Sequence, residues 1–161
     1  MARPYNQAPQ HVVVATDGTT SSHILPSPGQ HDGWDNSLFV DAAGTLHMAC
    51  VDPSPFGASN GLQYGTSDGT AWSFDSTVAG SGSFMYGLNT SVAVDSGGTA
   101  HVLYCQSENW VVDGGLAHAT GSPDWDFEPI DSGVGIGRFP SLAIDLADNL
   151  PATWLDVDPE D

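Results

Sequence analysis

The chain has 161 residues, and 40% of them are hydrophobic, so it can bury a core and is not a disordered polymer. Asp and Glu total 20 against two basic residues, and a formal net charge of −18 excludes nucleic acids and anionic membrane surfaces as expected partners. No apolar run reaches the ~18 residues that cross a bilayer, and the first ten residues lack the apolar core of a secretory signal.

The acidic excess has two interpretations, and the sequence does not decide between them. A dense carboxylate surface is typical of a halophilic protein, because high salt screens the self-repulsion of the charges. Alternatively, this is an acidic extracellular or cell-surface protein whose aspartates serve turns, since Asp forms turns better than Glu. The localisation is therefore unknown, with an extracellular or cell-surface site favoured.

In chain order, the first predicted elements are two strands within residues 11–25. The segment 11–16, His-Val-Val-Val-Ala-Thr, matches the third strand of the units that follow, and residues 20–25 form a weak fourth strand. The second predicted element, at 33–79, is a complete unit of four strands, and a second complete unit follows at 87–132. Residues 137–156 form the first two strands of another unit, where the pattern stops.

The evidence for these units is an internal repeat of about fifty residues. Ser37-Leu-Phe-Val-Asp41, Ser91-Val-Ala-Val-Asp95 and Ser141-Leu-Ala-Ile-Asp145 are equivalent, and each precedes a turn and a second apolar run. Gly44 and Gly98 supply the positive φ that this turn needs. The recurring aspartates before the turn are expected to bind backbone N–H groups.

Within each unit the strands become more polar from the first to the fourth, and this gradient predicts the architecture. The first strand is nearly continuous in apolar residues, as a strand buried on both faces should be, whereas the fourth alternates as in Trp72-Ser-Phe-Asp75 and Trp125-Asp-Phe-Glu128. This gradient predicts an all-β fold, a β-propeller of four-stranded antiparallel blades, in a single domain over residues 1–161. The two half-blades at the ends bring the total to about three blades.

Three blades are too few to close a ring, because propellers have about four to eight. Three arrangements stay open: two copies form a homodimer that closes a six-bladed ring, the chain is part of a longer propeller, or a single chain packs tightly by itself. Cys50 and Cys105 fall one position apart in the repeat, so we expect two buried free cysteines rather than a disulfide.

The repeated strings together resemble sialidase-like, Asp-box-type bacterial β-propeller repeats over residues 11–156. The closest match to the box is Thr66-Ser-Asp-Gly-Thr-Ala-Trp72, with degraded versions at Thr16-Asp-Gly18 and Thr120-Gly-Ser-Pro-Asp-Trp125. The resemblance implies a structural turn between the third and fourth strands, remote from any active site.

Catalysis is not favoured. Sialidase activity needs three arginines for the substrate carboxylate, and the repeat region holds Arg138 alone. Glycosidases need a carboxylate pair, but most aspartates here recur at turns, and no catalytic residue is predicted. No zinc spacing is present, and no cofactor is predicted, with structural calcium left open. His47 and His101 are equivalent, which favours a structural role over metal binding.

A ligand site is expected where the repeat varies, at the loops before each first strand and after each second strand. The predicted ligand-binding residues carry aromatic, carboxylate, amide and guanidinium groups suited to a small polar ligand: Trp34, Asp35, Asn89, Trp110, Arg138 and Phe139. The alternative is that Trp34 and Phe139 plug the mouth of the central channel.

The sequence thus predicts a non-catalytic, lectin-like module that binds a carbohydrate or another small polar ligand on the loop face of an oligomeric propeller. Two alternatives stay open: a fragment of a larger glycoside hydrolase-like propeller enzyme, and a structural repeat in a surface assembly.

Overall fold

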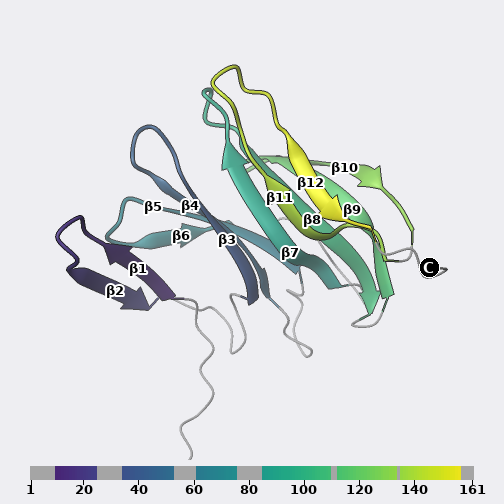
Figure 1. The fold of residues 1–161 in the computed structure, drawn as a ribbon, viewed down its shortest axis with the longest axis horizontal. Helices are drawn as coiled ribbons and strands as arrows, with labels where there is room; N and C mark the ends of the chain where they lie inside the picture. The colour runs from purple at the N-terminus through teal and green to yellow at the C-terminus, as the bar shows by residue number, and fades with distance from the viewer. Residues whose placement is uncertain are drawn as a thin grey trace, which may run out of the picture.

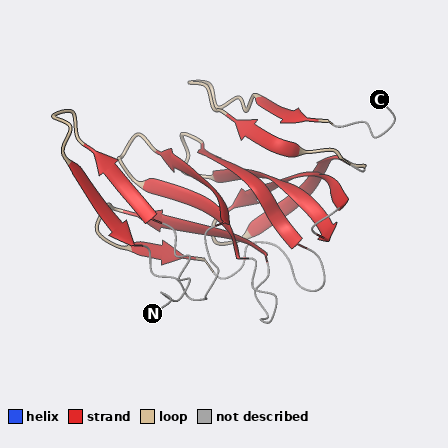
Figure 2. Cartoon of the chain, turned by 60° about the horizontal axis from the view of Figure 1, so that its bottom comes forward, coloured by secondary structure: helices blue, strands red, loops and turns tan. Residues whose placement is uncertain are grey.

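The computed structural model describes residues 10–24, 34–52, 61–75, 85–109, 112–133 and 135–156. These residues form strands and turns only, and no helix long and apolar enough to cross a membrane occurs among them (Figure 2). The strands are β1 (Gln10–Val14), β2 (Thr20–Ile24), β3 (Trp34–Val40), β4 (Leu46–Asp52), β5 (Gly61–Ser67), β6 (Trp72–Phe74), β7 (Met85–Val94), β8 (Ala100–Asn109), β9 (Val112–Gly121), β10 (Trp125–Asp131), β11 (Arg138–Leu142) and β12 (Ala152–Leu155).

The strands form four sheets in which neighbours in sequence are neighbours in space. Two sheets have four strands, β3–β4–β5–β6 and β7–β8–β9–β10, and two are hairpins, β1–β2 and β11–β12. Every pairing is antiparallel. The expected all-β class with four-stranded antiparallel sheets is therefore confirmed.

The sheets follow one another like an opened fan, from β1–β2 at one end to β11–β12 at the other (Figure 1). Strand β7 lies against β3, β4 and β5 of the preceding sheet, and β11 lies against β7, β8 and β9. The first strands of successive sheets, β3, β7 and β11, are thus adjacent, and we call them the inner strands. This packing fits a propeller-like arrangement as well as a β-sandwich, and the described strands do not close into a ring.

The main core lies between the two four-stranded sheets. Tyr64 and Leu62 on one sheet meet Tyr104 and Val102 on the next, and all four side chains are at most 2% exposed. Cys50 and Cys105 are buried and form no disulfide bond, as expected.

The prediction that each first strand is buried on both faces holds only for β7. Val92 and Val94 of β7 are 4% and 5% exposed, whereas their equivalents in β3, Leu38 and Val40, are 52% and 53% exposed. The prediction is wrong for β3 because the hairpin β1–β2 that precedes it does not pack against it in the way that β3, β4 and β5 pack against β7.

The turn after each first strand is built in the same way in all three copies. The carboxylates of Asp41, Asp95 and Asp145 each accept a backbone N–H from the residue four positions later, at 2.7–2.9 Å. Gly44 and Gly98 have φ of 87° and 88°, as predicted. The backbone role expected for these aspartates is confirmed.

Glycine is also required where the chain enters β11. Gly137 has φ 87°, and a Cβ there would lie 2.8 Å from the backbone nitrogen of Leu116. Gly44 has the same φ, but nothing lies within 4 Å of its virtual Cβ.

These two glycines make a matched pair. We expect Gly44→Ala to lower the free energy of unfolding by about 1–2 kcal/mol, the cost of a left-handed non-glycine residue. Gly137→Ala should cost clearly more, because the methyl group also overlaps the backbone of β9. Urea unfolding measures both; equal losses would show that the close approach of Gly137 to β9 does not matter.

The turn aspartates also predict an acid sensitivity. Hydrogen bonds from the Asn149 side chain, then from the backbone N–H groups of Asn149 and Ala147, hold the pKa of Asp145 below its ordinary 3.8. A depressed pKa adds stability above the unfolded-state value, and that stability is lost as pH falls below about 4 through the folded-state value.

Asp145→Asn should therefore lower the urea midpoint at pH 7 and flatten its fall between about pH 4 and pH 2. Asn149→Ala removes a donor while keeping the carboxylate, and should flatten the same fall. An unchanged pH dependence in both variants would contradict this account of the turn.

Candidate functional site

Each inner strand carries an irregularity at the same place in the repeat. The pairing register shifts between Trp34 and Ser37 in β3, between Leu88 and Ser91 in β7, and between Arg138 and Ser141 in β11. Within each shift one non-glycine residue has positive φ: Asp35 at 46°, Asn89 at 52° and Phe139 at 50°. A bulge bends a strand and redirects its side chains, so all three strands present a residue in the same unusual way.

Side-chain hydrogen bonds hold the three bulges side by side. The buried Thr90 hydroxyl donates to the carbonyl oxygen of Asp35 at 2.5 Å, which ties β7 to the bulge of β3. One strand further, the backbone N–H of Leu142 donates to the Ser91 hydroxyl at 2.9 Å. The relative positions of the bulges are therefore fixed by short polar contacts rather than by loops alone.

The bulges enclose a hollow of about 240 Å³ that we name the bulge hollow. Its lining combines polar side chains with one aromatic ring: Asp35, Asn36, Asn89, Thr90, Phe139 and Pro140. Asp35 is exposed, Asn89 is half-buried, and Phe139 is 68% exposed. The hollow thus offers a carboxylate, an amide and an aromatic face to a molecule from solvent.

Phe139 is the strained member of this set. Asp and Asn tolerate the left-handed region because their short polar side chains bond locally, whereas a bulky residue there is an outlier. Pro140 restricts its backbone further. Burial of the side chain offsets little of this backbone strain, because Phe139 is mostly exposed to solvent. Such strain concentrates at ligand-binding positions.

The structure brings together three of the six predicted ligand-binding residues, Asp35, Asn89 and Phe139. Arg138 lies next to Phe139, pairs with Leu155 at the start of β11 and is half-buried, but does not line the hollow. Trp34 precedes Asp35 in β3, and its side chain lies outside the described part, as does the whole of Trp110.

Sequence reasoning missed the other lining residues, Asn36, Thr90 and Pro140. A signal was present, since Asp35 and Asn89 occupy equivalent repeat positions and both residue types favour positive φ. That shared preference could have placed the bulge, and with it the residue that follows.

The two equivalent histidines each lie beside the turn aspartate of their own unit. Burial raises the pKa of Tyr64 to about 12, and the Tyr64 hydroxyl shares a hydrogen bond with His47 Nδ1, while His47 Nε2 lies 3.1 Å from Asp41. In the next unit, His101 lies 3.5 Å from Asp95 and 3.2 Å from His118. No group of three or more metal-ligating side chains occurs in the described ranges.

Comparisons with known proteins assign no family. No protein-family model matches the chain, and no curated protein matches it. Among solved structures, the fold is similar to that of a fucose lectin from Kordia zhangzhouensis, solved in complex with methyl-fucoside. The match has 12% sequence identity and a TM-score of 0.43, over 71% of this chain and 78% of the lectin.

The strain at Phe139 can be measured directly. We expect Phe139→Asn, which introduces the residue found at the equivalent position in β7, to raise the free energy of unfolding by about 1 kcal/mol. Urea unfolding of the two proteins tests this. A loss of stability would instead mean that the ring packs as a structural plug of the channel mouth.

Proposed function

We propose that the chain is a non-catalytic module that binds a carbohydrate or another small polar ligand in the bulge hollow. The observation that carries the proposal is the threefold repetition of a left-handed bulge residue, which directs Asp35, Asn89 and Phe139 to one hollow. In a purely structural repeat, an exposed phenylalanine would not be needed at a backbone position where asparagine or aspartate serves the other two strands.

The chemistry of the lining suits a sugar. The face of a phenylalanine ring stacks against the C–H surface of a pyranose, while carboxylate and amide groups accept and donate hydrogen bonds to its hydroxyls. The hollow is somewhat smaller than the usual range of binding pockets, which limits the ligand to a small molecule such as a single sugar ring. Trp34, Arg138 and Trp110 remain proposed contributors from the same loop face.

The lining argues against the glycoside hydrolase alternative. Of the described residues that line the hollow, Asp35 is the only one with a carboxylate, whereas glycoside hydrolysis uses two carboxyl groups about 5–10 Å apart. A lone exposed carboxylate is suited to holding a hydroxyl, not to dividing acid and base roles.

We further propose that the sheets are blades of a propeller of the sialidase-like, Asp-box type. The turns between third and fourth strands support this. Asp68 accepts the Thr70 backbone N–H at 2.9 Å, and Asp17 accepts that of Thr19 at the same distance. The adjacency of β3, β7 and β11 is also what blades around one axis require.

A glycan array probed with the folded chain tests the proposed function, followed by calorimetric titration of any sugar that binds. Phe139→Ala should weaken binding at least tenfold, or about 1.4 kcal/mol, because stacking is lost. Asp35→Ala and Asn89→Ala should each weaken it as well.

Leu146→Ala is the matched control, since Leu146 is a fully exposed apolar residue in a turn of the same half-unit. It should leave the affinity unchanged. Absence of binding across the array, or equal affinity of Phe139→Ala and the unsubstituted chain, would refute the proposal.

A further inference from the structure

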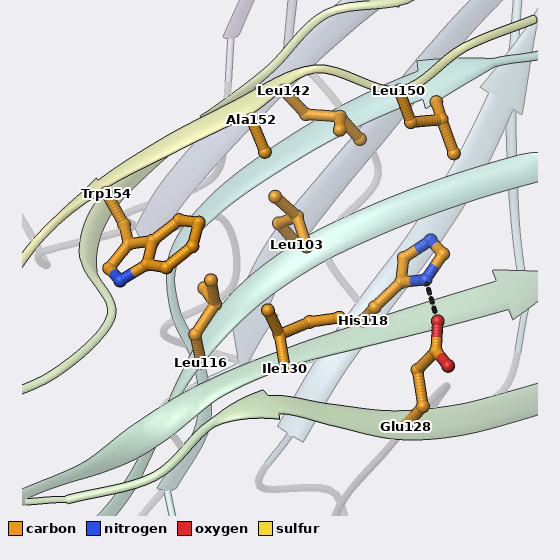
Figure 3. Close-up of a pocket in the computed structure, with 9 residues that line it drawn as sticks. All are labelled: Leu103, Leu116, His118, Glu128, Ile130, Leu142, Leu150, Ala152 and Trp154. Carbon is orange, nitrogen blue, oxygen red and sulfur yellow. Dashed lines mark hydrogen bonds and ion pairs between the residues drawn. The ribbon is translucent and has the colours of Figure 1, made fainter.

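A second, larger hollow of about 290 Å³ opens between the sheet β7–β10 and the hairpin β11–β12, and we name it the end groove (Figure 3). Its walls are mostly apolar, with one polar pair in which His118 Nδ1 lies 2.8 Å from Glu128 Oε1. The lining residues are Leu103, Leu116, His118, Glu128, Ile130, Leu142, Leu150, Ala152 and Trp154.

The end groove is the equivalent of the main core one repeat earlier. Leu103 pairs with His118 across β8 and β9 just as Ala49 pairs with Tyr64 across β4 and β5. When successive units of the repeat are aligned, every residue that lines the end groove, except Ile130, has a described counterpart one unit earlier. The counterparts are Ala49, Leu62, Tyr64, Asp75, Val92, Ala100, Val102 and Tyr104, and all but Asp75 belong to the buried cluster between the two four-stranded sheets.

The main core differs in one respect, namely that a third and a fourth strand cover it. Ala117 and Ala119 of β9 pack into that cluster, and Trp125 of β10 joins them. The Trp125 ring meets Tyr64 edge-on, with centroids 5.1 Å apart. In the described sheets, the hairpin β11–β12 has no third and fourth strand. The end groove therefore lies where a third and a fourth strand, added to β11–β12, would cover the apolar side chains.

The free edges beside the groove are suited to pairing. In the described sheets β12 pairs only with β11, and β1 pairs only with β2, so each has an unpaired side. None of these four strands contains Asp or Glu, in a chain with 20 acidic residues. An interface between them would therefore bring together the least repulsive parts of a strongly charged surface.

Exposed apolar side chains occur at both ends of the fan. Leu155 on β12 is 46% exposed, Val12 on β1 is 51% exposed, and Leu38 and Val40 on β3 are slightly more exposed. The equivalents of Leu38 and Val40 in β7 are buried because a preceding sheet covers them. If the sheet β11–β12 were completed by two more strands and packed against β3, all of these side chains would be covered at once.

We propose that the hairpin β1–β2 of a second copy of this chain completes the sheet β11–β12, with β1 adding antiparallel to β12 over the end groove. A chain's own hairpin lies at the opposite end of the fan and does not reach its own β12 (Figure 1). The exchange is reciprocal, so two chains form a two-fold dimer that closes a ring of six four-stranded sheets. This proposal is independent of the ligand, because one chain supplies the whole bulge hollow.

The repeat also gives the register of the new pair. Carrying the pairing of Cys105 with Leu116 over to the completed sheet, with Thr16 aligned to Thr120, places Val12 opposite Leu155. A register shifted by two residues would place Val12 opposite Thr153 instead. Both registers put Val12 on the same face of the sheet as Leu155. The two possibilities differ in which pair of introduced cysteines can form a disulfide.

Light scattering after size exclusion measures the assembly, in low salt and in molar salt. We expect a species of twice the 16.8 kDa chain mass, with a dimer fraction that rises with salt because screening weakens repulsion between two acidic chains. Leu155→Asp should shift the dimer to monomer. Leu146→Asp makes the same change on a fully exposed turn residue and should stay dimeric. Circular dichroism checks that both variants fold.

Cysteine cross-linking tests the pairing itself. After oxidation, one of two double variants should give a covalent dimer on a non-reducing gel. These are Val12→Cys with Leu155→Cys for the first register, and Val12→Cys with Thr153→Cys for the second. Val12→Cys combined with Ser73→Cys, an exposed position on β6, should not. A monomer under every condition, a larger open assembly, a dimeric Leu155→Asp variant, or a dimer that neither pair cross-links would each overturn the proposal.

Discussion

The structure depends on one constraint: each four-stranded sheet buries its inner strands only when another sheet covers its face. Between the two complete sheets the constraint is met, and Tyr64, Tyr104 and the small residues around them are almost fully buried. At the ends of the fan it is not met, and equivalent positions become exposed. The same residue types are therefore core in one copy of the repeat and surface in another, so burial here follows position in the array rather than local sequence.

The bulges obey a second, local constraint. The first strands β3, β7 and β11 lie side by side, and a left-handed residue bends each of them at the same point. Asp35 and Asn89 meet this need with little strain. Phe139 meets it at a conformational cost that burial does not offset, which is why we propose for it a role toward a ligand rather than toward the fold.

Much of the fold could be predicted from the sequence because its signals are local and recur in each copy. The turn aspartates, the glycines with positive φ and the apolar strand pairs all act within a few residues of one another, as at Asp41 and Gly44. The exposure of Leu38 could not be predicted in this way, because it depends on which sheet lies beside β3.

Part of the lining of the candidate site could be predicted for the same reason. Asp35, Asn89 and Phe139 follow from variation within a fixed repeat, whereas Thr90 enters the lining because its hydroxyl crosses to the carbonyl of Asp35 on a different strand. Nothing within either segment reports that contact. Residues 53 apart or more in sequence become neighbours only through the packing of whole sheets, as Ser37 and Thr90 do at 3.2 Å.

Binding and assembly use different parts of the repeat, and this separates their consequences. The bulge hollow is lined by the bulges at the start of three first strands within one chain, whereas the end groove is lined mainly by second, third and fourth strands, together with Leu142 at the end of the first strand β11. Closing the ring would therefore change the number of hollows per assembly, not their lining. Two hollows on one rigid dimer would bind a multivalent glycan surface more tightly than either alone, because the second contact becomes intramolecular. A change at Leu155 should accordingly weaken binding to a dense glycan surface while leaving the affinity for a free monosaccharide unchanged.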